Sequence, residues 1–223
     1  MEELYILRDV EFQLLAAALD FTRIYGIYPK GNPNEVEAMY SLHEMAQKGI
    51  LKQEGERLRL TEPYCTAIQN MKQARRVLSV SEVVAPLSNV CFYLGDMAVS
   101  LEESPQDENS VRIGTFKLKS LCSQLSDREL LPDPLWDKDV IERHLREDNT
   151  LHEWQKYARF QVFVLDGEEV SESSFYLWKG SGSYWVSEKE DIGTKCRPYD
   201  KEQFFRQLWE ALEQSDEEKE TGI

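Results

Sequence analysis

The chain has 223 residues, of which 41% are apolar and 30% are charged, and its formal net charge is −15. This composition is typical of a globular protein and excludes a disordered or fibrous chain. The strong negative charge disfavours nucleic acids and anionic membranes as partners, whereas it suits solubility and the recognition of basic or polar proteins.

The apolar runs are short, and none approaches the ~20 residues that a membrane-spanning helix needs. Residues 1–5 are acidic and do not resemble a secretory signal. We therefore expect a cytoplasmic protein with no membrane segment. The charge is unevenly distributed: residues 1–80 carry a net charge of −1, and the remaining residues carry −14.

Two helices are predicted within the first 50 residues. Asp9 can cap a helix over about residues 10–24, which has an apolar stripe at helical spacing. Asn32 can begin a second helix, with Glu35 as its capping-box carboxylate, and Gly49 ends it. The spacing in this second helix predicts one buried face, made of Val36, Met39, Tyr40, His43 and Ala46.

A β-hairpin and a third helix follow. Residues 50–53 and 56–60 flank a Glu54-Gly55 turn and alternate in polarity, which predicts two paired strands. Thr61 can cap the third helix. Its predicted buried stripe is Tyr64, Ile68, Met71, Ala74 and Leu78. Helices and hairpin together give residues 1–81 the order of a winged-helix-like unit.

The pattern then changes to strands. Residues 90–94, 97–103 and 110–116 predict a three-stranded meander. The helix expected after it carries Leu118, Leu121, Cys122 and Leu125. One or two connecting helices are predicted over about residues 137–158.

The same order of elements then returns. A second meander is predicted over residues 160–165, 173–179 and 184–187. Asp200 can cap the last helix, with Gln203 in the capping-box position. The apolar stripe of that helix is Phe205, Leu208, Trp209 and Leu212. The repetition suggests an internal pseudo-repeat.

These elements predict an α+β fold. A winged-helix-like unit over residues 1–81 precedes a domain over residues 82–215, in which two β-meanders form one antiparallel sheet with helices packed on it. Residues 216–223 are expected to form an acidic, flexible tail.

No motif of a catalytic or metal site is found in the sequence. The cysteines are scattered without a CxxC pair, which favours reduced thiols in a cytosolic protein: Cys65, Cys91, Cys122 and Cys196. The Gly/Ser stretch at residues 180–183 lacks the lysine and the following helix of a phosphate loop, so it is interpreted as a hairpin turn. We expect a protein without enzymatic activity, cofactor or metal.

Binding to DNA is the alternative that the winged-helix-like unit raises. The candidate recognition helix between the Pro/Gly loop and the hairpin carries three glutamates and only Lys48 as a cation, whereas phosphate contacts need Lys and Arg. A modest basic patch would have to serve instead: Arg57, Arg59, Lys72, Arg75 and Arg76. A transcription regulator is therefore ranked below a protein-binding module.

The strand at residues 173–179 is apolar on both faces, and so is its neighbour at residues 184–187. One face should pack on helices, and the other must be covered by this chain, by a second chain or by a client. Because Tyr and Trp dominate binding hot spots, the predicted partner-binding residues are Tyr176, Trp178, Tyr184 and Trp185. If they bind a partner, Trp178→Ala should weaken binding more than folding.

The order of elements resembles that of the secretion-associated chaperones of type VII (ESX) systems. The stretches that prompt the comparison are Leu58-Arg59-Leu60-Thr61-Glu62-Pro63, Cys91-Phe92-Tyr93-Leu94-Gly95-Asp96 and Leu130-Leu131-Pro132-Asp133. The resemblance implies a soluble cytosolic chaperone or adaptor that binds a helical secretion substrate without nucleotide. It carries over no binding residue to this sequence.

Overall fold

The computed structural model describes residues 3–27, 33–104, 107, 109–134, 154–180, 183–190 and 196–217. The chain divides into two compact units. Unit 1 comprises residues 1–75 and 90–118, and unit 2 comprises residues 76–89 and 119–223. The predicted domain boundary lay after residue 81. The observed units have other limits, because the first meander belongs to the same unit as the N-terminal residues.

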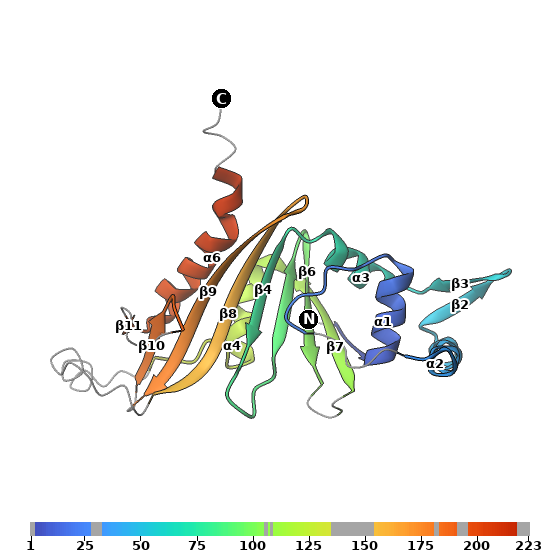
Figure 1. The fold of residues 1–223 in the computed structure, drawn as a ribbon, viewed down its shortest axis with the longest axis horizontal. Coiled ribbons are helices and arrows are strands. Elements are labelled where there is room, and N and C mark those ends of the chain that lie inside the picture. Colours follow the sequence, from blue (N-terminus) through green and yellow to red (C-terminus); the bar gives the residue numbers. More distant parts are fainter. Residues whose placement is uncertain are drawn as a thin grey trace. The chain divides into compact units, whose positions relative to one another are not determined.

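In the described part of unit 1, four antiparallel strands lie in one sheet in the order β1-β7-β6-β5 (Figure 1). The predicted meander is confirmed as β5 (Val90–Leu94), β6 (Met97–Glu103) and β7 (Ser110–Lys117). Strand β1 (Glu3–Arg8), which pairs with β7, was not predicted.

The predicted hairpin of unit 1 is also confirmed. Strands β2 (Leu51–Glu54) and β3 (Arg57–Leu60) pair antiparallel and form a separate two-stranded sheet. Gly55 in the turn has φ +64°, a conformation that few residues other than glycine adopt. Thr61 does not cap a helix: its hydroxyl donates to the Gly49 carbonyl at 2.7 Å, at the base of the hairpin.

The first helix of unit 1, α1 (Asp9–Ala18), is shorter than predicted. Its N-cap is Arg8 rather than Asp9, and the buried Glu11 completes a capping box with it. The chain leaves the helix at Leu19, and Asp20 has φ +53°.

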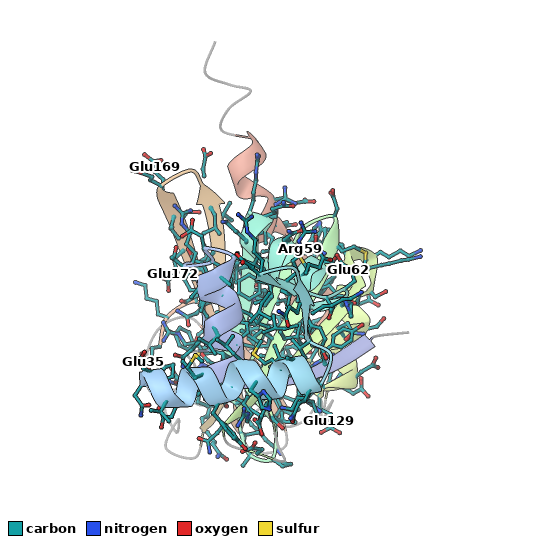
Figure 2. All side chains as sticks on the ribbon, turned by 90° about the vertical axis from the view of Figure 1, so that its right-hand side faces the viewer. Glu35, Arg59, Glu62, Glu129, Glu169 and Glu172 are labelled. Carbon is teal, nitrogen blue, oxygen red and sulfur yellow. The ribbon has the colours of Figure 1, made fainter. Side chains whose placement is uncertain are left out.

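The second helix, α2 (Glu35–Gln47), begins two residues later than predicted. Asn34 is the N-cap, and its side chain accepts from the Glu37 amide at 3.0 Å, so Glu37 takes the place predicted for Glu35. The axes of α1 and α2 cross rather than run side by side (Figures 1 and 2).

The predicted buried face of α2 is wrong. Val36, Met39 and Tyr40 are 78%, 64% and 60% exposed. The side of the helix that packs inward carries Ser41 and Met45 instead. The spacing predicted the helix correctly, but it identified the wrong face as the core.

The third helix, α3 (Tyr64–Gln73), follows Pro63 as its N-cap residue and buries Ala67, Ile68 and Met71. It ends before Leu78, which the sequence analysis placed on it. Leu78 is buried in a strand of unit 2.

Among the described residues of unit 2, five antiparallel strands follow the order β4-β8-β9-β10-β11. The second meander is confirmed, and the strands are longer than predicted; β4 and β11 were not predicted. The bounds are β4 (Arg76–Ser81), β8 (Gln155–Asp166), β9 (Glu169–Gly180), β10 (Ser183–Ser187) and β11 (Arg197–Pro198).

The predicted connecting helices at residues 137–158 fall largely outside the described residues, and residues 155–158 belong to β8 instead. The helix predicted after the first meander is confirmed as a 3-10 turn (Leu118–Ser120) followed by α4 (Leu121–Asp127). Most of the acidic tail lies beyond the described residues, although its first two residues continue the last helix.

That last helix, α6 (Lys201–Glu217), packs along β8 and β9 (Figure 1). Asp200 caps it as predicted, accepting from the Gln203 amide at 2.7 Å. Its buried stripe starts at Phe204, not at Phe205. The Phe204 ring meets Phe160 edge to face at 5.1 Å, with no exposed surface on either ring.

Candidate functional site

The four aromatic residues predicted to bind a partner are buried. Tyr176, Trp178, Tyr184 and Trp185 are 5%, 4%, 9% and 3% exposed. They divide between the two faces of the β9–β10 pair, because successive side chains on a strand point to opposite faces. As described, they present no open surface to a partner, and their role in binding stays a prediction.

On one face, Tyr176, Trp178 and Trp185 form an aromatic cluster, against which Trp154 and Cys196 pack. Trp154 stacks on Trp185 with 5.1 Å between ring centroids. The indole N–H of Trp178 donates to the Ser187 hydroxyl at 2.8 Å, so its polar atom is satisfied inside the protein. The cluster has the contacts of a folded core.

Cations and carboxylates border this cluster. The Lys156 ammonium lies 5.6 Å from the ring centre of Tyr176, a distance suited to cation–π attraction. The same ammonium donates to Glu82 at 2.5 Å and to Glu190 at 2.7 Å. The hydrogen bond from Lys156 lowers the pKa of Glu82 below its usual value. The position over the Tyr176 ring where a cation could bind is therefore already occupied by the Lys156 ammonium.

Gly180, at the end of β9, makes room for Trp154. A Cβ atom at this position would lie 2.4 Å from Cδ1 of Trp154, closer than any tolerated contact. We expect Gly180→Ala to displace the Trp154 indole and to lower the free energy of unfolding by about 1–3 kcal/mol. Tryptophan fluorescence should shift to longer wavelength, and an unchanged spectrum with unchanged stability would contradict this packing.

On the opposite face, Tyr184 packs among other tyrosines. Its ring centre lies 5.2 Å from that of Tyr157 and 6.0 Å from that of Tyr199. The Tyr157 hydroxyl donates to the Glu129 carbonyl at 2.6 Å. Burial raises the pKa of Tyr157 to about 12, and burial also raises the pKa values of Tyr184 and Tyr199.

This tyrosine group predicts a pH dependence. Because Tyr157 titrates at 10 in the unfolded chain and at about 12 in the folded one, its contribution to stability is complete below pH 10 and is lost as the pH rises through 12. Tyrosinate absorbance should show a component near pH 12 that Tyr157→Phe removes. Titration of every tyrosine near pH 10 in the folded protein would contradict the assignment.

Two basic residues of the DNA-binding alternative, Arg59 and Lys72, lie beside acidic side chains. Arg57 and Arg59 are exposed on the hairpin, and Arg59 pairs with Glu54 at 3.1 Å. Lys72 donates to the Leu19 carbonyl at 2.8 Å and lies 3.7 Å from Asp20. The neighbouring carboxylates weaken the positive field that phosphate binding needs.

The other two basic residues proposed to bind DNA, Arg75 and Arg76, lie at the boundary in the sequence between the two units. Arg75 is the last residue of the N-terminal part of unit 1, and Arg76 begins β4 of unit 2. The role of these five basic residues in binding DNA stays a prediction.

Unit 1 contains an apolar hollow that the sequence pattern did not predict. Its volume is about 350 Å³, and α1, α2, the hairpin and α3 enclose it. All of its lining residues but one are uncharged: Leu14, Leu15, Ala18, Leu19, Leu42, Met45, Leu51, Leu58, Arg59, Leu60 and Cys65. Leu58 is 50% exposed on β3. The hollow has the size and lining of a site for an apolar ligand or side chain.

A buried carboxylate holds α2 against α1 beside this hollow. The Glu11 side chain has no exposed surface, and it accepts from the Arg8 amide at 2.9 Å and from the Lys48 ammonium at 2.6 Å. Arg8 also pairs with Glu44 of α2. These charged contacts connect α2 to α1 and to the residue that caps α1.

The outward side of α2 is a second candidate surface, although its residues were predicted to be buried. We call Val36, Met39 and Tyr40 the outer α2 face; all three are exposed. Figure 2 shows α2 crossing in front of α1, with Glu35 at its N-terminal end and Arg59 on the hairpin. The sequence did contain a signal for this surface. Apolar residues occur on two sides of the helix, because Leu42 and Met45 lie on the other side.

No group of three or more His, Cys, Asp or Glu side chains that could hold a metal ion occurs among the described residues. In the same part of the chain, no helix combines the length and the apolar character that crossing a membrane would require. Cys91 is fully buried, and burial raises the pKa of its thiol.

No protein-family model matches the sequence, and no curated protein sequence matches it. Among solved structures, the fold is similar to that of the type VII secretion system chaperone EspG5 of Mycobacterium tuberculosis, determined in complex with a PE25–PPE41 dimer. The TM-score is 0.61 at 12% identity, over 95% of this chain and 96% of that chain. This likeness confirms the α+β fold class and the resemblance to type VII secretion chaperones.

Proposed function

We propose that the protein is a non-enzymatic chaperone or adaptor that binds a protein client in the cytoplasm and serves a bacterial type VII secretion system. The observation that carries this proposal is the fold likeness to EspG5, which extends over 95% of the chain. EspG5 was determined with a protein dimer bound. Because one fold hosts many functions, the surface of this chain must also be suited to a protein client.

Two features of unit 1 support a protein client. The hollow beside α2 is lined by apolar side chains, and the outer α2 face exposes three more. Apolar surface that the chain leaves uncovered is typical of protein-binding sites. The net charge of −15 disfavours nucleic acid and anionic lipid as the ligand.

Affinity purification of the full-length protein from its native host tests the proposal. We expect one protein to co-purify in stoichiometric amounts at physiological salt, and the recombinant pair to elute as one complex in gel filtration. Recovery of no stoichiometric protein, at low salt as well as at physiological salt, would overturn the proposal.

A DNA titration separates the proposal from the regulator alternative. We expect no change in the fluorescence anisotropy of a labelled mixed-sequence duplex at physiological salt. Binding that Arg57→Ala and Arg59→Ala weaken would instead favour a transcription regulator.

A further inference from the structure

The outer α2 face has the side-chain spacing of a helix-packing surface. Val36, Met39 and Tyr40 stand at positions i, i+3 and i+4, which adjoin one another on a helix. Their exposed fractions are the three largest among the large hydrophobic residues of the described chain. Such a ridge packs into the groove of another helix, and ridge-into-groove packing is the common geometry of helix pairs.

The face is preformed. The contacts of Glu11 with Lys48 and of Arg8 with Glu44 hold α2 on α1 from the inward side. The Arg8 guanidinium also lies 6.0 Å from the ring centre of Tyr40, which limits the freedom of that ring. A partner would therefore meet an ordered surface, and little conformational entropy would be lost on this side.

The charges on α2 select the partner. The helix contains Glu35, Glu37 and Glu44 but no lysine or arginine. Glu35 and Glu37 are exposed beside the apolar ridge. A second copy of this chain would bring the same carboxylates against each other, and an anionic membrane would be repelled by the exposed Glu35 and Glu37. A basic partner meets neither obstacle.

We propose that the outer α2 face binds an amphipathic helix of the protein client, with apolar side chains at helical spacing and Lys or Arg beside them. This inference rests on the proposed client-binding function. The apolar side chains of the client helix cover Val36, Met39 and Tyr40. Its cations lie near Glu35 and Glu37, which fixes the orientation of the helix.

A peptide titration with the full-length protein tests this surface. The probe is a fluorescein-labelled helical peptide with leucines at i, i+3, i+4 and i+7 and lysines beside them, followed by anisotropy at physiological salt. We expect Val36→Ser/Met39→Ser/Tyr40→Ser to weaken binding by at least ~10-fold. A twin peptide with glutamate in place of lysine should bind at least ~10-fold more weakly than the basic one.

The matched control is Val170→Ser, which alters another exposed apolar side chain, 46% exposed on β9. We expect it to leave peptide binding unchanged. Because the triple variant keeps every carboxylate, loss of binding cannot come from a weaker general attraction for cations. Its urea midpoint should match that of the unaltered protein, since all three side chains are exposed.

Three results would overturn the inference: equal binding by the triple variant, equal binding of the acidic peptide, or concentration-dependent dimers in sedimentation velocity that the triple variant abolishes. The purified client separates this inference from the proposed function. If a client co-purifies with the unaltered protein and with the triple variant alike, the function stands and the site is wrong. If no client is found and the peptide still depends on the outer α2 face, the surface stands and the function is wrong.

Discussion

Replacing Trp178 with alanine is expected to lower the free energy of unfolding by about 3–5 kcal/mol. Trp178 is 4% exposed and lies in the aromatic cluster with Tyr176 and Trp185. The substitution removes buried apolar area, leaves a cavity and deprives the Ser187 hydroxyl of its indole donor. Urea unfolding of the full chain, followed by far-ultraviolet circular dichroism, measures the loss.

Trp209→Ala is the matched control. Trp209 is only half-buried on α6, and its indole donates to Glu213 at 2.7 Å on the surface. Its loss should cost less than half as much as the loss of Trp178. If Trp178→Ala left stability unchanged and removed client binding, the burial argument would fail and the original expectation of a contact residue would be correct.

Replacing Glu11 with alanine is expected to cost about 3 kcal/mol of unfolding free energy. The substitution leaves the Arg8 amide without its acceptor and removes the partner of Lys48. This loss is at the lower end of the range expected for breaking a buried ion pair. The reason is that the Lys48 side chain is 47% exposed, so water can solvate its ammonium once Glu11 is gone. Urea unfolding again provides the measurement.

Glu35→Ala removes a carboxylate from the exposed start of α2, and it should change the unfolding free energy by less than ~0.5 kcal/mol. Glu11→Gln keeps an acceptor for the Arg8 amide but loses the charge, so an intermediate effect is expected. Equal stabilities for the alanine variants of Glu11 and Glu35 would show that the buried carboxylate does not hold α1 and α2 together.

The strands that the sequence predicted correctly are those bounded by turns with a clear chemical signature. Gly55 and Gly167 both have φ +64° in the hairpins that they close. These turns marked where the first strand of each hairpin ends, whereas β8 and β9 begin earlier than predicted, at Gln155 and Glu169.

The missed strand β4 shows what periodicity cannot distinguish. Met71, Ala74 and Leu78 continue a helical spacing, so the third helix was extended through residue 78. In the structure Val77, Leu78 and Val80 are buried in a strand. A short run that is apolar on both sides fits a buried strand as well as a buried helix, and only its pairing with β8 decides between them.

The site was less predictable than the fold, because a side-chain pattern does not reveal what covers it. Trp178 and Trp185 have the composition of a binding hot spot, yet Trp154 and Cys196 pack over their cluster. Conversely, Val36 and Met39 have the spacing of a core face and are exposed. Whether a distant part of the chain covers a given side chain decides both cases, and local sequence cannot specify this.

The division of the chain also has a consequence for its synthesis on the ribosome. Unit 1 needs residues 1–75 and 90–118, so it can assemble before most of unit 2 has been made. Strand β4 emerges between these segments, while its antiparallel partner β8 starts only at Gln155. Translation at about 5–20 residues per second leaves this buried-type strand without β8 for several seconds. The sheet of unit 2 can therefore be completed only after synthesis has passed Asp166, the last residue of β8.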